Sequence, residues 1–438
     1  MIDLNNKTDV DSAAQLVELA REARSRTLGL IEDLTDEQLI GPQLSIVNPL
    51  LWEIGHVAWF QERWALRHLR KEKPLLEGGD ALYDSAAVAH DTRWDLLLPS
   101  RAQTLQYMET VLGRVVERLG ATQSDEDTVY FHLLATFHEG MHDEAITYTR
   151  QTLGYPAPRL NDSSEYVEGG FLEGDVEVPG GTFQLGATPD LGFVFDNEKW
   201  AHAVIVKPFR IARAPVTNAA FAEFVEAGRY GERKWWSEAG WSWRQRARVE
   251  SPVYWERGPD GRWLRRVFDR LVPLRESLPV IHVNWYEAEA YCAWAGRRLP
   301  TEAEWEMAAS AEPATKGGLS DRKRIFPWGD EFPTAECANL DWQRMGCIDV
   351  GSLPAGDSAF GCRQMIGNVW EWTADDFLPY PGFVIDPYKE YSQPWFGNHK
   401  VLRGGCWTTR ARLIRNTWRN FYTPDRRDVW AGFRTCAK

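Results

Sequence analysis

Two of the nine histidines, His138 and His142, lie four residues apart in the segment HEGMH. On a helix this spacing places both imidazoles on one face, and neighbouring apolar residues indicate that this face points into a core. A third histidine, His56, lies among apolar residues in the segment LLWEIGHVAW. A buried imidazole is costly unless it is hydrogen-bonded or bound to a metal. The three histidines therefore predict a facial metal site inside a helical bundle, with hydrogen-bonded core histidines as the alternative.

The same segment matches the H-E-x-x-H pattern of zinc metalloproteases, in which Glu139 would act as the general base. The longer form of that motif requires a glycine and a histidine where Ala145 and Tyr148 stand, so that form is absent. A protease would also leave His56 without a function. A zinc-dependent hydrolase is therefore the more remote alternative, and the spacing of the histidines by itself fits iron and zinc equally.

Residues 1–155 contain the start signals of four helices. Ser12 and Ser100 each open a capping box, Asn48 precedes a proline, and Ser124 opens the fourth helix. Apolar residues recur at three- and four-residue spacing in these segments, and one long connection separates the second helix from the third. This pattern predicts a four-helix bundle, with His56 on the second helix and the HEGMH segment on the fourth.

Residues 176–438 have a different texture, with short apolar runs, glycine and proline turns, and many aromatic residues. Strand signals lie at 178–186, 203–212, 401–407 and 431–436. Helices are expected only at about 217–227, 286–295 and 301–310. Pro, Asp, Ser and Gly residues between positions 156 and 175 indicate a linker. The expected fold class is α+β, with the bundle at 1–155 followed by a loop-rich domain at 176–438.

The composition excludes several classes of partner. The chain has 63 acidic and 50 basic residues and a formal net charge of -13, which repels a phosphate backbone and anionic lipid. We therefore expect neither nucleic acid nor a membrane as a partner. The first residues lack a basic region followed by an apolar one, and no run approaches the roughly 18 apolar residues of a transmembrane helix. These features predict a cytoplasmic protein.

Seven ordered motifs in the second half resemble the formylglycine-generating-enzyme/sulfatase-modifying domain, a variant of the C-type lectin fold. The motifs are PGGTF (179–183), FDNE (195–198), PVTN (215–218), RLPTEAEWE (298–306), PWG (327–329), GNVWEW (367–372) and RGG (403–405). True formylglycine-generating enzymes carry a copper-binding cysteine pair after the Gly-Gly pair. Here that segment reads CWTTRARLI, without the pair, so formylglycine formation is not expected.

A DinB-like bundle ahead of this domain, with one histidine on the second helix and two on the fourth, resembles the ergothioneine-pathway sulfoxide synthases. The resemblance covers essentially the whole chain. It implies that His56, His138 and His142 bind iron(II). It also implies a nonheme oxygenase that uses O2 to join a chalcogen to carbon 2 of the imidazole of hercynine, which is trimethylhistidine.

The resemblance further implies residues that handle hercynine. The segment YKEYS (388–392) matches a family segment in which a tyrosine donates a proton and an electron during the reaction, which makes Tyr388 the candidate donor. Tyr391 would hydrogen-bond the substrate imidazole. Asn420 matches the position that contacts hercynine, and its aromatic surroundings suit a trimethylammonium group.

Some positions depart from the family members that use γ-glutamylcysteine. Tyr422 stands where those enzymes have an aspartate, and Met141 stands where they have a glutamine. Those enzymes also use two arginines to bind the carboxylates of the donor, and the segment from His90 to Arg93 has only one arginine. Loss of a carboxylate-binding arginine disfavours a dianionic donor. The pattern resembles the selenoneine synthase branch, whose donor is a selenosugar. In that case His90, Arg93, Tyr422 and Arg426 would line the donor pocket.

Two alternatives to this selenoneine synthase-like function stay open. The first is a hercynine sulfoxide synthase of ergothioneine biosynthesis, with γ-glutamylcysteine or cysteine as the thiol donor. The second is a binding module, in which the lectin-like half recognises a ligand and the histidines have only a structural role.

Overall fold

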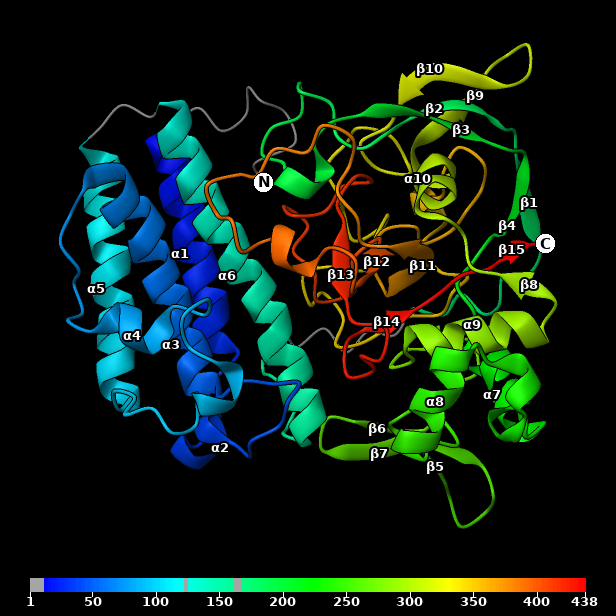
Figure 1. Cartoon of the computed structure of the whole chain (residues 1–438), viewed down its shortest axis with the longest axis horizontal. Helices are drawn as coiled ribbons and strands as arrows, with labels where there is room; N and C mark the ends of the chain where they lie inside the picture. The colour runs from blue at the N-terminus through cyan, green and yellow to red at the C-terminus, as the bar shows by residue number, and fades with distance from the viewer. Residues whose placement is uncertain (1–11, 122–124, 161–166) are drawn as a thin grey trace. The chain divides into compact units, whose positions relative to one another are not determined.

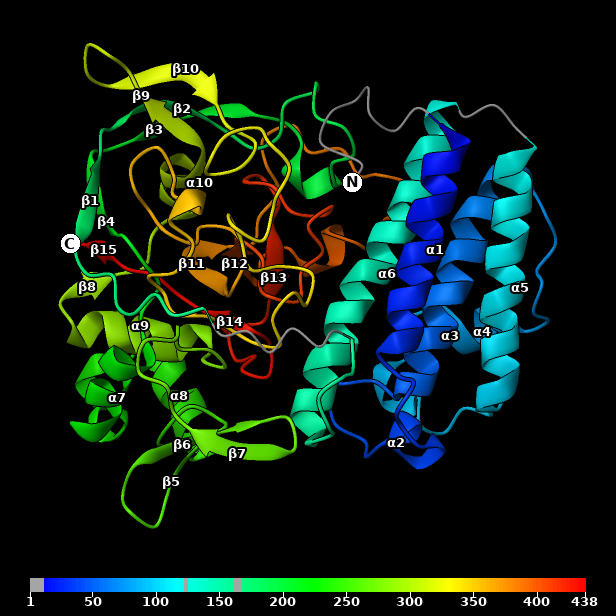
Figure 2. The same ribbon diagram turned by 180° about the vertical axis from the view of Figure 1, so that it is seen from behind.

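The computed structural model describes residues 12–121, 125–160 and 167–438. The chain divides into two compact units, Met1–Asp162 and Ser163–Lys438, and Figures 1 and 2 show the elements of each. In the three described stretches, no helix combines the length and the apolar character needed to span a bilayer.

The first unit is helical, as predicted. Its elements are α1 (Ala13–Gly29), α2 (Asp36–Ile40), α3 (Leu50–Gln61), the π-helical η1 (Glu62–His68), α4 (Gly79–Tyr83), the 3-10 turn η2 (His90–Thr92), α5 (Arg101–Gly120) and α6 (Glu126–Leu153). Helices α1, α3, α5 and α6 pack side by side, with α1 and α3 each contacting both α5 and α6 (Figure 1). This packing confirms the four-helix bundle.

Two of the predicted helix starts are confirmed in detail. The hydroxyl of Ser12 accepts from the backbone N–H of Gln15, and the Gln15 side chain accepts from the Ser12 N–H. Ser100 and Gln103 form the same reciprocal pair at the start of α5. Each capping box satisfies two backbone donors that the first helical turn leaves without intrahelical partners.

The other two starts differ from the prediction. Pro49, and not Asn48, is the N-cap of α3, and the Asn48 side chain instead donates to Glu53. Asp125 caps α6 by accepting from the N–H of Thr128, while the predicted cap Ser124 lies outside the described residues. Each observed cap lies one residue after the predicted one, because Asn, Ser and Asp near a helix start can all accept from a backbone N–H and their types alone do not single out the cap.

The second predicted helix continues past Gln61 as the π-helical segment η1. Glu62, at its start, is buried and accepts hydrogen bonds from the Tyr107 hydroxyl (2.6 Å) and the Leu75 N–H (3.2 Å). Such segments inside α-helices often accompany functional sites. The apolar pattern did not predict it, because α and π periods differ too little over seven residues.

The second unit mixes helices with short strands in several small sheets (Figure 2). The strands are β1 (Asp175–Val178), β2 (Gly181–Leu185), β3 (His202–Val206), β4 (Phe209–Ala212), β5 (Trp255–Arg257), β6 (Trp263–Val267), β7 (Arg270–Pro273), β8 (Arg297–Arg298), β9 (Ala311–Pro313), β10 (Leu319–Lys323), β11 (Trp370–Asp376), β12 (Lys400–Arg403), β13 (Asn420–Tyr422), β14 (Ala431–Gly432) and β15 (Cys436–Ala437). The helices are α7 (Asn218–Glu226), α8 (Glu238–Ala247), α9 (Trp285–Trp294) and α10 (Glu302–Ser310).

Helix α8 was not predicted, and the expectation of helices at only three places in this unit was wrong. Ser237 caps α8 by accepting from the N–H of Gly240. Within the helix only Gly240 and Trp243 are buried, so its apolar stripe is one turn long. A stripe that short carries too little periodicity to be recognised in the sequence.

One sheet orders its strands β13-β12-β11-β14. Strand β12 pairs antiparallel with β11 on one side and β13 on the other, with Leu402 opposite Asn420 and Lys400 opposite Tyr422. Because β13 pairs only with β12 in this order, it forms the edge of the sheet. The register therefore places two of the predicted substrate-binding residues on an edge strand.

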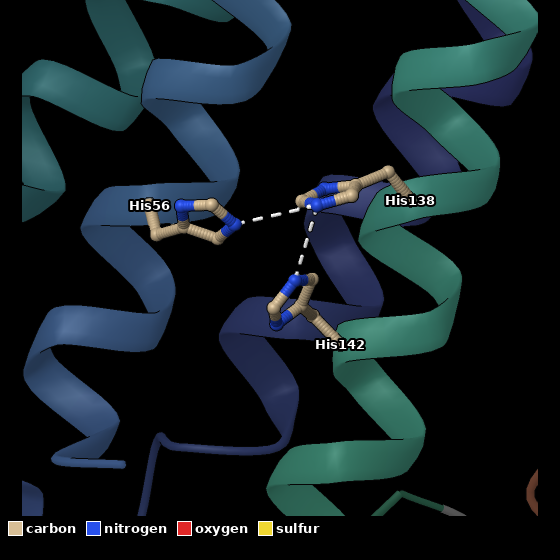
Figure 3. A group of neighbouring side chains, drawn as sticks. All are labelled: His56, His138 and His142. Atoms are coloured by element: carbon tan, nitrogen blue, oxygen red, sulfur yellow. Dashed lines mark hydrogen bonds between the residues drawn. The ribbon is translucent and has the colours of Figure 1, made fainter. Parts of the chain in front are cut away.

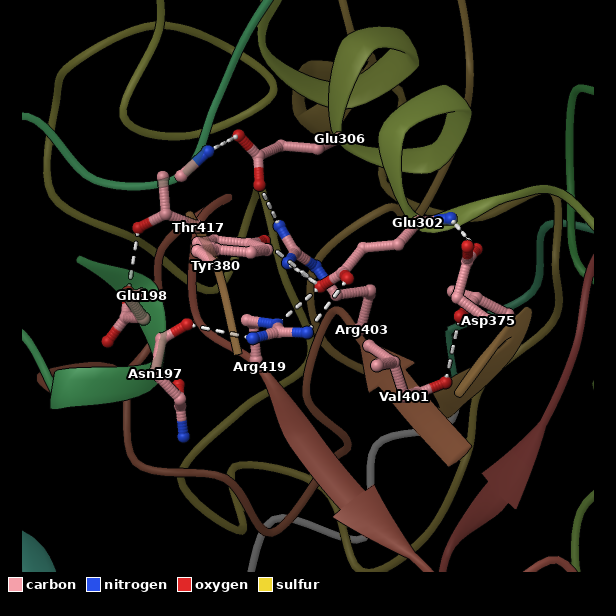
Figure 4. Close-up of polar contacts among 12 residues, drawn as sticks. Asn197, Glu198, Glu302, Glu306, Asp375, Tyr380, Val401, Arg403, Thr417 and Arg419 are labelled. Atoms are coloured by element: carbon pink, nitrogen blue, oxygen red, sulfur yellow. Dashed lines mark hydrogen bonds and ion pairs between the residues drawn. The ribbon is translucent and has the colours of Figure 1, made fainter. Parts of the chain in front are cut away.

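A buried network of charges ties this sheet to α10 (Figure 4). Glu302 accepts from Arg403 (2.8 Å) and Arg419 (2.7 Å). Glu306 pairs with Arg403 and with Lys323, the latter at 2.6 Å. Breaking one partner of a buried ion pair typically costs about 3–5 kcal/mol, because a charge is left without compensation. The acidic residues of the RLPTEAEWE motif and the arginine of the RGG motif therefore hold the scaffold together.

We predict that Ser100→Ala lowers the free energy of unfolding of the bundle by about 1 kcal/mol, because the N–H of Gln103 loses its acceptor. Thr110→Ala on the same helix is the control. Its exposed hydroxyl bonds only to the Gln106 carbonyl of its own helix, so a change within about 0.5 kcal/mol is expected. Urea unfolding followed by far-ultraviolet circular dichroism measures both, and equal effects would contradict the capping role.

Candidate metal centre

The three predicted histidines converge on one point. His56 comes from α3, and His138 and His142 come from successive turns of α6 (Figure 3). The Nε2 atom of His138 lies 3.3 Å from that of His56 and 3.2 Å from that of His142. One ligand atom from each ring lies within 4.8 Å of the others. The structure therefore brings together the set that the sequence predicted.

The opposite ring nitrogens of His56 and His142 face acceptors. His56 Nδ1 lies 2.7 Å from the backbone carbonyl oxygen of Tyr83, and His142 Nδ1 contacts a carboxylate oxygen of Glu53. A carbonyl and a carboxylate can only accept, so both rings carry their proton on Nδ1 and present a lone pair at Nε2. Acceptors behind metal-binding histidines have this same role in known metal sites.

Hydrogen bonding alone does not account for the convergence. A neutral imidazole that carries its proton on Nδ1 has no proton to donate from Nε2. His138 Nε2 has at most one N–H, which faces two acceptors. Three nitrogen lone pairs directed at a common point are the donor set of a divalent metal ion. The residues present therefore fit a three-histidine metal site.

Burial keeps two of the three histidines neutral. It lowers the pKa of His56 to about 3, and lowers that of His138 well below its usual value. Burial alone would raise the pKa of Glu53, but the neighbouring His142 and the hydrogen bond from Asn48 bring it down to about 2. At neutral pH His56 and His138 are neutral imidazoles, and Glu53 is a carboxylate.

Aromatic rings fix the planes of two ligands. Trp52 stacks on His56 with ring centroids 4.7 Å apart and an interplanar angle of 10°. Phe60 stacks on His138 at 3.5 Å and 5°. All four side chains are buried. Such packing restricts the rotamers, so the rings are held in position before a metal binds.

A glycine allows the Tyr83 carbonyl to reach His56. A Cβ atom built on Gly55 would lie 2.4 Å from ring atoms of Tyr83, a distance that real Cβ contacts do not show. Gly55 directly precedes His56 on α3. The missing side chain therefore lets the Tyr83 ring pack against the helix, and the backbone of Tyr83 accepts from His56.

Glu139 does not face the histidines. Its carboxylate is buried and accepts from Arg24 Nε (2.8 Å) and from the Thr27 hydroxyl (2.9 Å), both on α1. Consecutive residues on a helix differ by about 100° in direction, so the neighbour of His138 points to a different side of α6. This geometry argues against the metalloprotease alternative, because Glu139 is engaged elsewhere and cannot act as the general base.

The remaining predicted residues of the first unit lie near the N-terminal part of α3 or on α6. His90 Nε2 bonds to the Val47 carbonyl at 2.7 Å. Arg93 is buried, and its Nη1 donates to Asn48 Oδ1 at 2.6 Å. Met141 directly precedes His142 on α6 and is half-buried.

In the second unit, the two predicted tyrosines are neighbours. The ring centroids of Tyr388 and Tyr391 lie 6.0 Å apart. Tyr391 stacks on Phe195 at 4.3 Å and lies 5.9 Å from Phe421 of β13. Burial raises the pKa of the Tyr391 hydroxyl, which accepts from Trp418 Nε1 at 3.5 Å. Tyr391 is therefore a neutral phenol at physiological pH.

The other predicted residues of this unit lie on and after β13. The Asn420 side chain accepts from the N–H of Phe421 at 2.8 Å. Arg426 forms an ion pair with Asp428 at 2.7 Å, and its guanidinium lies 5.2 Å from the Tyr422 ring centroid. The structure thus gathers these residues and the two tyrosines around the edge strand β13.

Glu53 was not predicted as a residue of the site, although the sequence contains a signal for it. It is the only charged residue in the otherwise apolar run LLWEIGHVAWF and lies three residues before His56. A lone charge in a buried run is costly without a partner, so its presence there was a usable signal. The carbonyl of Tyr83 gave no such signal, because every residue has one.

The chain matches two families of known proteins. Residues 19–146 match the DinB superfamily, and residues 166–438 match the sulfatase-modifying factor enzyme 1-like domain. Over 435 residues the chain is 40% identical to the hercynine oxygenase of Mycolicibacterium thermoresistibile, covering 97% of this chain and 95% of that protein. The hercynine oxygenase of Mycobacterium tuberculosis is 40% identical over 421 residues, covering 95% and 96%. The formylglycine-generating enzyme of Streptomyces coelicolor is 34% identical over 288 residues, covering 60% of this chain and 88% of that protein.

We predict that Gly55→Ala weakens the binding of a divalent metal by about tenfold or more, because the added methyl group displaces Tyr83 and with it the acceptor for His56. Titration with cobalt(II) under anaerobic conditions, followed by visible absorption, measures the affinity.

The matched control is Gly113→Ala, also a helical glycine of the bundle, where an added Cβ meets nothing within 4 Å. Alanine there is expected to raise the free energy of unfolding by about 0.5–1 kcal/mol and to leave cobalt(II) affinity unchanged. Wild-type affinity in Gly55→Ala would show that Tyr83 does not support the site.

Proposed function

Because the chain belongs to the hercynine oxygenase family, and is therefore an oxygenase, we propose that it uses iron(II) and O2 to form a carbon–chalcogen bond on hercynine. The observation that carries the iron part of the proposal is the convergence of three imidazole side chains, from His56, His138 and His142. Three histidines on one side of a metal leave adjacent positions open, as nonheme iron oxygenases require.

The proposed reaction joins a thiol or selenol to carbon 2 of the hercynine imidazole. One C–H bond and one S–H or Se–H bond break, and a C–S or C–Se bond forms. One oxygen atom of O2 ends on the chalcogen as the sulfoxide or selenoxide, and the other leaves as water, so the four electrons that O2 accepts are balanced. Bound iron(II) would supply the activation of O2 and a coordination position for the chalcogen.

The residues of the chain have distinct roles in this proposal. The three histidines hold the metal, and Glu53 and the Tyr83 carbonyl keep the His142 and His56 rings in the Nδ1–H tautomer. Tyr388 is the proposed proton and electron donor, since a phenol can give up both.

Residues around β13 are proposed to bind hercynine. The neutral Tyr391 hydroxyl is able to donate to the imidazole of the substrate, and Asn420 offers an amide. The rings of Tyr391 and Phe421 lie close together at this edge. Aromatic faces attract a trimethylammonium group, whose positive charge is spread over its methyl groups.

Two kinds of donor are proposed, and different observations favour each. The relationship to hercynine oxygenases favours a thiol, γ-glutamylcysteine or cysteine, in ergothioneine biosynthesis. In contrast, Arg93 donates to Asn48 and Arg426 is paired with Asp428, so these two guanidinium groups already have partners. A carboxylate donor would have to compete for them, which favours a donor without carboxylates, such as a selenosugar.

The decisive experiment loads the purified chain with iron(II) anaerobically and then admits air with hercynine and one donor at a time. The donors are γ-glutamylcysteine, cysteine and a 1-seleno sugar, and mass spectrometry identifies the products. We expect an oxygenated adduct of hercynine and the consumption of one O2 per adduct. No O2 consumption with hercynine and any of the three donors would overturn the proposed function.

His138→Ala tests whether the histidine triad is responsible. We expect loss of bound iron and of adduct formation, because two histidines no longer make a facial site. His132→Ala is the control, since His132 lies on the same helix and bonds to the Thr128 carbonyl instead. Iron binding that survives in His138→Ala would show that the metal lies elsewhere.

A further inference from the structure

Arg93 lies at one end of a chain of hydrogen bonds that leads to His142. Arg93 Nη1 donates to Asn48 Oδ1 at 2.6 Å, and Asn48 Nδ2 donates to Glu53 Oε1 at 2.6 Å. The other oxygen of Glu53 accepts from His142 Nδ1. A side-chain amide has one oxygen and one NH2 group. By holding the oxygen of Asn48, Arg93 directs the NH2 group toward Glu53.

The same guanidinium supports a second ligand through a different contact. It lies over the Trp52 ring at 3.9 Å from the centroid. Trp52 in turn stacks on His56, with 4.7 Å between the ring centroids. Arg93 therefore contacts both Trp52, which fixes the plane of His56, and Asn48, which orients the carboxylate behind His142.

Arg93 is also held by a hydrogen bond to a backbone carbonyl of the connection in which it lies. It follows η2 in the connection between α4 and α5, and Nη2 donates to the Val88 carbonyl at 3.3 Å. Its side chain is 8% exposed. The positive charge of Arg93 and the negative charge of Glu53 lie on opposite sides of the Asn48 amide, so they attract each other across it. These contacts leave the guanidinium fixed and little exposed to a substrate.

We propose that Arg93 is a positioning residue of the metal centre and does not bind the donor substrate. Through Asn48 it sets the carboxylate of Glu53, and through Trp52 it sets the ring of His56. This role rests on the proposed metal function and replaces the expectation that Arg93 lines the donor pocket. A planar guanidinium is suited to it, because one face stacks on an indole while the edge donates to an amide and a carbonyl.

The test measures cobalt(II) affinity and the visible spectrum of the cobalt form in the absence of hercynine, donor and O2. Arg93→Met keeps the length of the side chain but removes the charge and the donors. We expect the affinity to fall by about 10–100-fold, with altered absorption bands, because supports behind metal ligands have effects of this size.

Two further variants keep the test decisive if Arg93→Met is poorly folded. Arg93→Lys retains the charge but loses the planar stack, and we expect an intermediate loss of affinity. Asn48→Ala breaks the chain at its next member. The double variant Arg93→Lys, Asn48→Ala should lose less than the two single losses combined, because both act through Glu53.

Arg101→Met is the matched control. Arg101 belongs to the same unit and donates to the Leu34 carbonyl at 2.6 Å, without contact to the supports of the histidines. We expect wild-type cobalt(II) affinity and spectrum in this variant.

The outcomes separate this inference from the proposed function. Wild-type cobalt(II) affinity and spectrum in the Arg93 variants, with a raised KM for the donor, would overturn the positioning role and leave the proposed function intact. Failure of the unaltered chain to bind cobalt(II) or iron(II) would overturn the metal function and the inference together.

Discussion

The arrangement of the three histidines in the first unit depends on which ring nitrogen of His56 and His142 carries a proton. The Nδ1 protons of His56 and His142 are donated to the Tyr83 carbonyl and the Glu53 carboxylate, which leaves the Nε2 lone pairs directed inward. The Nε2 atom of His138 lies 3.2–3.3 Å from both of the others. The first unit thus directs three imidazole nitrogens at one point, an arrangement that a bound metal ion would stabilise.

Helix α6 carries two polar clusters on different sides. One side presents His138 and His142, which meet His56 of α3, while Glu139 faces Arg24 of α1. His138 and Glu139 are both buried, and each meets a different neighbouring helix. The turn of about 100° per residue therefore allows one short segment to supply the candidate metal ligands and a structural ion pair on different sides of the helix. The same segment as a protease motif would need Glu139 beside the metal.

In the second unit, the residues that hold the fold together and the residues proposed to bind substrate lie in different segments. The motifs that identify its family supply buried scaffold residues, such as Glu302 and Arg403 in the network of Figure 4. The residues proposed to handle substrate, including Tyr388 and Asn420, lie outside those motifs, on a loop and on the edge strand β13. A scaffold can be shared by enzymes of different chemistry when the residues that handle substrate lie outside the motifs that build it, and this chain resembles both formylglycine-generating enzymes and hercynine oxygenases.

The sequence by itself determined the four long helices of the bundle, which motifs build the second unit, and that His138 and His142 share a face, because these features depend on local spacing and capping. Only the tertiary structure decided the rest. His142 meets Glu53 across 89 positions of the chain, and Arg93 meets Asn48 across 45. Such pairings depend on how α3, α6 and the connection before α5 pack together. Local periodicity fixes the face of the helix on which a side chain lies. Packing selects the hydrogen-bond partner of that side chain and, for a histidine, the ring nitrogen that carries the proton.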